Sequence, residues 1–446
     1  MLKMEINLIK IRTMYSKYNR YLHKIPNNFK TIGLVIIPSI LYLIRGWQYI
    51  RTPQLYAEDG ALWLADAYNK GWRTLFSPYN GFAHTTERLF ALLVIMFPLK
   101  FAPLIFNLAG YGLFILMCYY LFSSRVKIFT NNFQKLFMAL SLGLIANFIE
   151  FIFNFSTSIF LIGVIGLCIY FAKPANNTVI RLVEKILFIL ACLTLPFAWF
   201  YLVIILFDWI WRKQYKIFYI VVSIFGSIVQ LYVYLFSDYS RTNSVHTRIL
   251  LTSKYTVLEI FNQIITPALR FAQINIGVNI PLYQFLIIFI FCVLLGLVLL
   301  SVLIKHGTIQ LKYLVLFSVL FTMAALKNPL VGGNLNSVNI LKLMDTTELG
   351  NRYFFYGILG VTAVLAIAAS TYINKKARIY FLLLYISFGL LTSVVAGELI
   401  INKNFSNYSA SYINGIKNLN RTKQGTLITI PENPGTTWFI KLYAKK

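Results

Sequence analysis

Long apolar blocks alternate with short polar stretches along the whole chain. Several blocks run for about twenty residues, the length that an α-helix needs to cross the hydrocarbon core of a bilayer. The clearest are residues 31–50, 101–122, 282–304, 313–325 and 353–373. The pattern predicts an all-α polytopic membrane protein with about 11 transmembrane helices, because only helices or closed barrels satisfy the backbone in lipid.

Two stretches depart from this simple pattern. Residues 87–122 hold two apolar pieces that prolines interrupt. We interpret 88–98 as a short helix that enters only part of the membrane, followed by one full span, since partly inserted backbone is tolerated beside protein or water. The apolar pieces 181–193 and 197–211 are short and meet at Pro196, where we expect a hinge near the outer surface.

Basic residues gather in alternate polar stretches. The tail 1–30 carries seven Lys and Arg residues against one acid, Glu5. Basic clusters recur within 125–135, 173–185, 212–216, 305–312 and 375–378. Cytoplasmic loops carry an excess of Lys and Arg, so we place the tail and all of these clusters inside.

The remaining loops then lie outside and hold most of the acids. Three regions follow: a cytoplasmic basic tail (1–30), a transmembrane domain (31–396) and a small extracytoplasmic C-terminal segment (397–446). The long first outer loop covers 51–86. The C-terminal segment combines β-branched runs with turn residues, which predicts a small hairpin or cap.

Composition excludes a water-soluble protein. Of all residues, 58% are hydrophobic and 12% are charged, whereas soluble domains carry about a quarter charged residues. The net charge of +27 lies in short loops, so it sets orientation among membrane lipids and does not indicate nucleic acid. The four cysteines lie inside apolar blocks without close pairing, and we expect them to be small packing residues.

The first outer loop holds adjacent carboxylates, Glu58 and Asp59, ahead of a helical pattern. One interpretation is that either acid caps this helix, whose dipole stabilises negative charge. The other is a general base, since a shielded carboxylate at the membrane surface can accept a proton from an attacking hydroxyl.

The motif "HTTER" follows, with His84, Glu87 and Arg88 on one helix face. They form either a surface ion pair or, because Arg88 opens a membrane-inserted segment, a site whose partner is a lipid phosphate. His84, Glu58 and Asp59 lack a diagnostic ligand spacing. We therefore assign no metal ligands among these three residues. A divalent metal as a further cofactor is an alternative that the sequence leaves open.

Glu150 and Asn154 lie four residues apart in an apolar stretch. A carboxylate there needs a partner or a polar cavity, whereas an asparagine is also common at helix contacts. Arg352 and Tyr353 stand at the outer mouth of a span. They anchor the helix as interfacial residues, or Arg352 binds a phosphate through its planar guanidinium. Other candidates for phosphate binding are Arg241, Arg248, Arg270 and Lys327.

The strings "YAEDGALWL", "YNGFAHTTERLF", "IEFIFNFS" and "NRYFF", with the topology, resemble the GT-C superfamily of multi-span glycosyltransferases, in particular bacterial membrane proteins of this type. The sharpest local match is the acid pair at the start of the first outer loop. The chain departs from many members in being shorter and in lacking a large soluble outer domain.

The resemblance implies a bacterial inner-membrane enzyme that uses a polyprenyl-phosphate-linked sugar as donor. A glycan or glycolipid, such as lipopolysaccharide or a surface polymer, would accept the sugar with inversion. Asp59 would be the base, with Glu58 positioning the acceptor or taking that role. Arg352, with Arg88, would hold the phosphate. The other substrate-binding candidates that the resemblance implies are His84, Glu87, Glu150, Asn154 and Tyr353.

Two other functions fit the sequence. An O-antigen-type polymerase or ligase shares the donor and would use the outer loop 237–280, which holds Arg241, His246, Arg248 and Arg270. A transporter or flippase of lipid-linked sugars would carry charges in the middle of its spans and often shows repeats. In this chain, the ionisable residues concentrate at one face.

Overall fold

A computed structural model describes residues 27–145, 153–236, 257–258, 260–269, 280–327, 351–395, 408–433 and 438–445. Helices dominate these residues, which confirms the predicted helical class. The tail 1–26 and most of the outer loop 237–280 lie outside the described residues.

Apolar helices occupy the predicted blocks. In the described part of the chain, four segments are long and apolar enough to cross a membrane: Leu99–Phe122, α12 (Ile217–Phe236), α16 (Leu282–His306) and α19 (Phe355–Tyr372). The first comprises η3 (Leu99–Phe101) and α6 (Ala102–Phe122). The other apolar helices are α2 (Asn27–Arg45), α7 (Asn132–Gly143), α8 (Phe155–Ser158), α9 (Leu161–Phe171), α10 (Thr178–Thr194), α11 (Phe197–Arg212), α17 (Ile309–Lys327) and α20 (Lys375–Val395).

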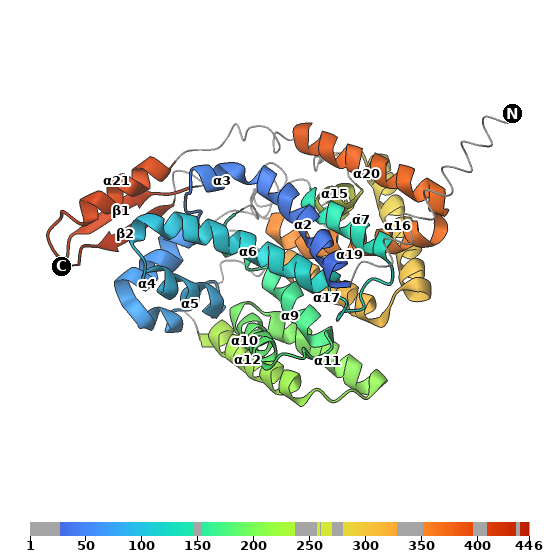
Figure 1. The fold of residues 1–446 in the computed structure, drawn as a ribbon, viewed down its shortest axis with the longest axis horizontal. Coiled ribbons are helices and arrows are strands. Elements are labelled where there is room, and N and C mark those ends of the chain that lie inside the picture. Colours follow the sequence, from blue (N-terminus) through green and yellow to red (C-terminus); the bar gives the residue numbers. More distant parts are fainter. Residues whose placement is uncertain are drawn as a thin grey trace.

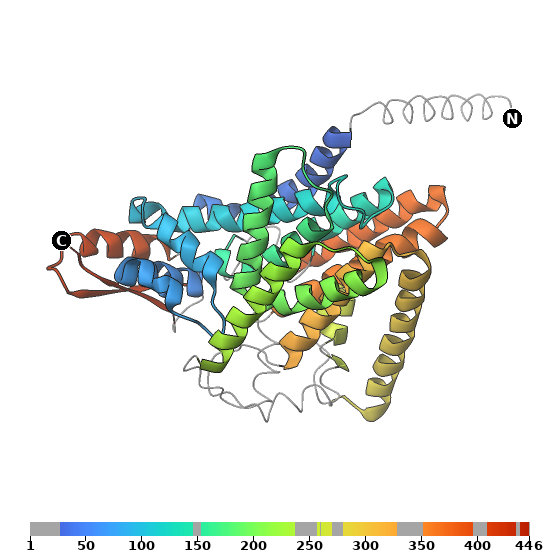
Figure 2. The same ribbon diagram turned by 90° about the horizontal axis from the view of Figure 1, so that it is seen from below.

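The helices form one bundle (Figure 1). Its core is rich in aromatic side chains. The helix α9 is buried along its whole length. In contrast, α16 stands at the edge of the bundle (Figure 2) and buries only Val302 and Leu303 fully. An apolar helix with this exposure suits a lipid environment. Cys118, Cys168 and Cys192 are buried and unpaired, as expected for packing residues.

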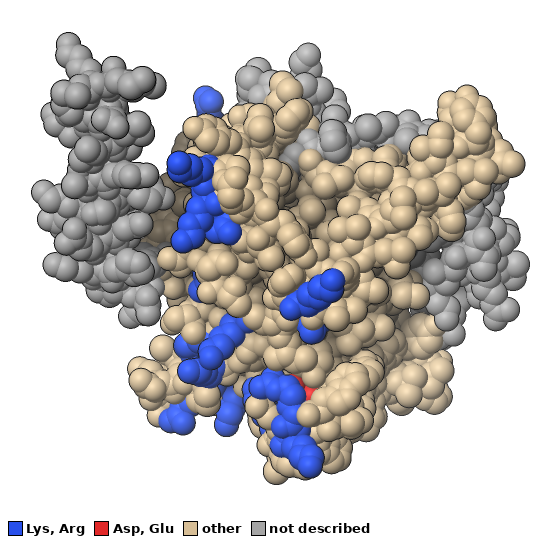
Figure 3. All heavy atoms as spheres, turned by 90° about the vertical axis from the view of Figure 1, so that its right-hand side faces the viewer, with Lys and Arg blue, Asp and Glu red and all other residues tan. Residues whose placement is uncertain are grey.

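The basic loops meet at one end of the bundle. The Lys173 amide donates to the Arg125 carbonyl at 3.0 Å, and the Thr308 hydroxyl donates to the Ile128 carbonyl at 3.0 Å. Figure 3 shows Lys and Arg spread over the end of the molecule that lies on the right in Figure 1. Three of the basic loops that we predicted on one side of the membrane, near residues 125–128, 173 and 308, therefore contact one another.

Two acids that the charge pattern left at this basic end are neutralised. The Glu184 carboxylate accepts hydrogen bonds from Nη1 and Nη2 of Arg125, at 2.6 and 2.9 Å. Asp208 accepts from Arg212 at 3.2 Å and from the Tyr170 hydroxyl at 2.8 Å. Neither acid is left as an isolated charge.

The helices α10 and α11 are bent by 118° at the break that contains Pro196. The carbonyl of Thr194, at the end of α10, accepts the His84 amide at 3.1 Å. The predicted hinge therefore lies beside the first predicted outer loop.

The predicted first outer loop folds into short helices at the other end of the molecule (Figure 1). The helix α5 (Thr85–Val94) has ten residues, or about 15 Å, so it is too short to cross a bilayer. The sequence predicted such a short helix at 88–98, and the observed helix begins and ends a few residues earlier. Beside it pack the π-helix η1 (Asp59–Leu64), α4 (Ala65–Lys70) and η2 (Gly71–Phe76), while α3 (Trp47–Arg51) packs on α6.

The C-terminal segment forms the predicted hairpin and packs on the first loop. The helix α21 (Ser409–Leu419) precedes antiparallel strands β1 (Leu427–Pro431) and β2 (Phe439–Tyr443). Asn69 on α4 donates to the Lys441 carbonyl at 2.8 Å and accepts the Tyr443 amide at 3.1 Å. The remaining short elements are η5 (Phe261–Ile265), α15 (Thr266–Ala268) and η6 (Asn351–Phe354).

Candidate active site

Asp59 opens the π-helix η1 and has no exposed surface. Its carboxylate accepts the Phe155 amide at 3.0 Å, and the Ser156 amide and hydroxyl at 2.8 and 2.5 Å. Asp59 therefore caps the start of α8, a helix about a hundred residues further along the chain, and not its own helix. Burial raises the pKa of Asp59 to about 7, against the hydrogen bonds from Ser156 and Phe155.

Glu58 precedes it and is also buried. Its side chain makes no capping hydrogen bond, and its Oε2 has no hydrogen-bond partner among the described residues. A buried acceptor without a donor costs about 1–3 kcal/mol. Glu58 thus keeps a free oxygen that a ligand hydroxyl would satisfy, whereas Asp59 is occupied by protein donors.

Trp63 connects the acid pair to the "HTTER" motif. Its indole nitrogen donates to the Ser156 hydroxyl at 3.0 Å, and that hydroxyl donates to Asp59. The Trp63 ring lies 5.0 Å from the His84 ring and 5.1 Å from the Arg88 guanidinium carbon, centroid distances that suit stacking and cation–π contact. The structure therefore brings Asp59, His84 and Arg88 together around Trp63.

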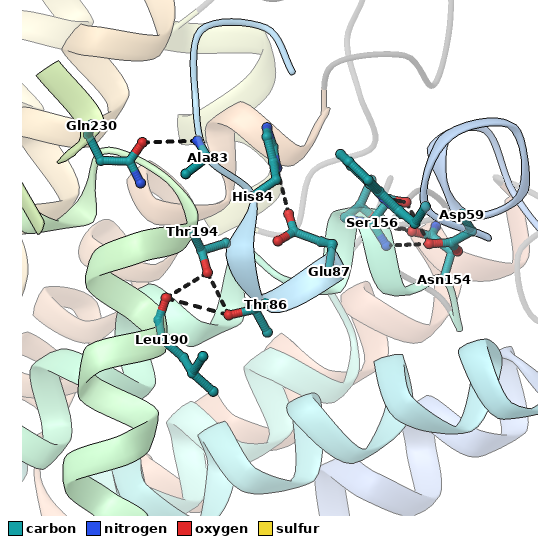
Figure 4. A network of polar contacts seen from close by, with 12 residues as sticks. Asp59, Ala83, His84, Thr86, Glu87, Asn154, Ser156, Leu190, Thr194 and Gln230 are labelled. Atoms are coloured by element: carbon teal, nitrogen blue, oxygen red, sulfur yellow. Dashed lines mark hydrogen bonds and ion pairs between the residues drawn. The ribbon is translucent and has the colours of Figure 1, made fainter. Parts of the chain in front are cut away.

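His84 and Glu87 form a buried pair, not a surface ion pair. His84 Nδ1 lies 2.7 Å from Glu87 Oε1, and the Glu87 carboxylate has no exposed surface. His84 Nε2 and Glu87 Oε2 have no partner within the described part of the chain. Figure 4 shows the pair between the Asp59–Ser156 contacts and the Thr194 end of α10. An imidazole oriented by a carboxylate, with its second nitrogen free, is a common arrangement for binding or moving protons.

The segment that carries His84 is held to neighbouring helices. Gln230 on α12 accepts the Ala83 amide at 3.2 Å, and the Thr86 hydroxyl lies 2.6 Å from that of Thr194 (Figure 4). His84 itself adopts a left-handed backbone, with φ of 52°, which is uncommon for a residue other than glycine. The chain on either side of His84 is thus held in place, at Ala83 by α12 and at Thr86 by α10.

Arg88 is nearly fully buried and has protein partners. Its Nη1 donates to Asp66 at 3.1 Å and to the Thr74 hydroxyl at 2.6 Å. Arg88 therefore ties α5 to α4 and η2, and its Nε lacks a partner among the described residues. Within this motif, Arg88 therefore forms its ion pair with Asp66, which lies outside the motif. His84 pairs with Glu87.

Asn154 and Tyr353 are both buried, and Asn154 lies next to Phe155, whose amide donates to Asp59. Asn154 accepts the Thr157 amide at 3.0 Å and so caps α8, the helix that Asp59 also caps. The Tyr353 ring packs edge-on against Phe160, with ring centroids 6.0 Å apart. Since Tyr353 is only 5% exposed, it is not part of an exposed aromatic belt.

Several predicted residues lie outside this description. Glu150, Arg241, Arg248 and Arg270 fall outside the described residues. The backbone of Arg352 belongs to η6, but its side chain and that of Lys327 are not described.

Sequence reasoning missed two members of the site, Ser156 and Glu432. Ser156 lies in the string "FNFSTS" but gave no signal of its own. Glu432 was grouped with the outer acids without a role, yet its Oε1 accepts the Gly60 amide at 2.8 Å. The only available signal was an acid within a hairpin of otherwise basic and neutral residues.

Among the described residues, no three His, Cys, Asp or Glu side chains are arranged to hold a metal ion. Comparisons of the chain with family models, with curated proteins and with solved structures found no match. A functional assignment therefore depends on the chemistry of this site.

Proposed function

We propose that this chain is a membrane glycosyltransferase of the GT-C type. It moves a sugar from a polyprenyl-phosphate donor to a glycan or glycolipid acceptor of the cell envelope. The observation that carries this proposal is the buried cluster of Glu58, Asp59, His84 and Glu87. Three of these residues keep a polar atom without a partner among the described residues, and unpaired buried polar atoms call for a ligand.

The proposal includes a topology. The basic loops that meet at one end (Figure 3) lie in the cytoplasm with the N-terminal tail, and about 11 spans place the acid cluster outside. The membrane is the inner membrane of a bacterium. The position of the acid cluster, away from the basic loops between helices, supports this orientation.

In the reaction, the acceptor hydroxyl donates a hydrogen bond to Glu58 Oε2 and transfers its proton there. The hydroxyl oxygen attacks the anomeric carbon, the bond from that carbon to the phosphate oxygen breaks, and polyprenyl phosphate leaves with the electron pair. The configuration inverts. Glu58 suits the role of base better than Asp59, because three hydrogen bonds already occupy the Asp59 carboxylate.

The other residues position the substrates. Asp59 fixes the start of α8 against the acid pair, and His84 Nε2 binds an acceptor hydroxyl under the control of Glu87. Arg352 binds the donor phosphate, because Arg88 Nη1 already donates to Asp66 and Thr74. Asn154 and Tyr353 support this arrangement from within the bundle, and Glu150 orients the sugar.

The test is sugar transfer by the purified protein in liposomes, with a panel of labelled polyprenyl-phosphate sugars and envelope glycan acceptors. We expect Glu58→Gln to lower the rate by about 10²-fold or more, the usual range for a lost general base. Glu184→Gln is the matched control, since Glu184 is a buried acid at the opposite end, and it should keep transfer.

Other outcomes would contradict the proposal. Full transfer by Glu58→Gln would remove the assigned base. Movement of the lipid-linked sugar across the bilayer without transfer would favour a flippase. Growth of a repeating polymer from a lipid-linked oligosaccharide would favour a polymerase.

A further inference from the structure

Two consecutive residues of the C-terminal segment bracket the acid pair. Just before Glu58, the Ala57 amide donates to the Asn433 carbonyl at 2.6 Å. Just after Asp59, the Gly60 amide donates to the Glu432 carboxylate at 2.8 Å. The backbone on either side of the acid pair is therefore held by chain that lies more than 370 residues away.

The contact at Gly60 has no room for a larger residue. A β-carbon added at Gly60 would lie 2.5 Å from Glu432 Oε1 and 2.7 Å from its carboxyl carbon. Carbon atoms do not approach a carboxylate oxygen this closely without displacement. A methyl group at Gly60 would therefore displace the Glu432 carboxyl group from its hydrogen bond with the Gly60 amide.

Glu432 is buried beside two other carboxyl groups. Only 1% of its surface is exposed, and its Oε2 has no partner among the described residues. Burial and the neighbouring Asp59 and Glu58 raise its pKa well above the ordinary range, while the backbone amides of Gly60 and Ala61 oppose this shift. Tyr412 on α21 also faces Glu432. A protonated Glu432 avoids a third negative charge in this dry cluster.

The rest of the C-terminal segment follows the same loop. The Tyr408 amide donates to the side chain of Gln54 at 3.2 Å, and the Tyr412 hydroxyl donates to the Leu99 carbonyl at 2.8 Å. Lys445 donates to the Tyr68 carbonyl. These contacts fall on both sides of the acid pair, so the segment is docked around Glu432 as a whole.

We propose that Glu432 is a positioning residue of the acid site, which the C-terminal segment holds against the Gly60 amide to fix the backbone of Glu58 and Asp59. The inference depends on the proposed glycosyl transfer for its catalytic consequence. The contact itself does not depend on that function.

The first experiment tests the contact without any activity. The thermal unfolding of the full-length protein in detergent is measured for Gly60→Ala, Glu432→Ala and the double variant. We expect Gly60→Ala to lower the unfolding temperature by several degrees in the native background. In the Glu432→Ala background it should have little effect, because the space is then free. Equal effects in both backgrounds would overturn the inference.

The second experiment measures sugar transfer from the labelled polyprenyl-phosphate donor across pH. Glu432→Gln mimics the protonated acid, so at pH 7 it should stay within about threefold of the native rate, whereas Glu432→Ala should lose about tenfold or more. As pH rises, the native rate should fall relative to that of the glutamine variant, because the carboxyl group of Glu432 can ionise and the amide cannot.

Native transfer by Glu432→Ala, or identical alkaline behaviour of the native protein and Glu432→Gln, would overturn the positioning role. If the native protein transfers no sugar at all, the proposed function fails. The coupling between Gly60 and Glu432 in the unfolding experiment then still decides whether the contact exists.

Discussion

At the scale of single residues, Asp59 combines complete burial with three hydrogen-bond donors. Its pKa is raised from 3.8 to about 7 in the folded protein. The folded state therefore binds a proton that the unfolded state releases between these values, and stability from this group is lost as pH rises through that window.

We predict that the native protein loses stability relative to Asp59→Asn as pH rises from about 4 to 7, by about 1.4 kcal/mol per pH unit at most. Thermal unfolding in detergent at several pH values measures this difference. Ser156→Ala is the control, because it keeps the carboxylate and should retain the pH dependence. Parallel curves for the native protein and Asp59→Asn would contradict the prediction.

His84 and Glu87 should act as one unit in transfer. Glu87 orients the imidazole through the 2.7 Å contact, so we expect Glu87→Gln to lower the transfer rate by about 10–100-fold, as for other orienting partners. His84→Ala should lose at least as much, and the double variant should be no slower than His84→Ala alone. Initial rates in liposomes measure all three. Losses that multiply in the double variant would show that the two residues act independently.

At the scale of elements, neighbouring side chains pack closely against the two glycines of α9, Gly163 and Gly166. A β-carbon at Gly163 or Gly166 would meet the hydroxyl of Tyr356 or Tyr201 respectively. We predict that Gly163→Ala and Gly166→Ala each destabilise the protein by about 1–3 kcal/mol, because both tyrosines are buried and overpacking strains the core.

Gly112 in α6 offers the matched control for this prediction. Nothing lies within 4 Å of its added β-carbon, so Gly112→Ala should be neutral or stabilise the helix by up to about 1 kcal/mol. The fraction of protein that stays monodisperse in detergent after heating measures the three variants. A loss for Gly112→Ala equal to that of the α9 variants would contradict the packing argument.

Elements were predictable from the sequence where the signal is local. The apolar blocks, the short helix α5, the hinge at Pro196 and the C-terminal hairpin each follow from neighbouring residues. The capping of α8 by Asp59 does not, because donor and acceptor lie about a hundred residues apart. The same holds for Glu432 at Gly60, since a contact between remote segments leaves no periodic trace in either one.

The sequence indicated which residues lie in the candidate site better than it indicated what each of them does there. Spacing brought His84, Glu87 and Arg88 to one helix face, and the structure adds them to Asp59 through Trp63. Spacing could not show that Arg88 bonds Asp66 or that Asp59 has its oxygens occupied. Burial and hydrogen bonding decide those roles, and both depend on tertiary packing.

At the scale of the whole molecule, the basic loops between helices and most of the described acids lie at different ends of the bundle. The basic loops 125–128, 171–173 and 307–308 contact one another, and the described acids of the other end cluster around Trp63 and Gly60. The orientation of the bundle therefore decides which side of the membrane the proposed chemistry faces.

The bent pair α10–α11 makes this orientation testable in detail. With a bend of 118°, a helix pair that enters and returns places Lys173 and Lys213 on the same side. A single broken span would place them on opposite sides. Both lysines are exposed, as are Arg73 in the first loop and Gln424 in the C-terminal segment.

Single cysteines at these four positions, in a background without the native cysteines, can be labelled with a maleimide that does not cross membranes. We expect Arg73→Cys and Gln424→Cys to react in intact spheroplasts. Lys173→Cys and Lys213→Cys should react only after the membrane is opened, because the positive-inside rule places the basic loops in the cytoplasm. If Lys213→Cys is labelled from outside and Lys173→Cys is not, α10 and α11 form a single span. The predicted membrane orientation of every later helix would then be reversed. Labelling of Arg73→Cys only after opening would place Asp59 at the cytoplasmic face, where no extracytoplasmic donor or acceptor can reach it.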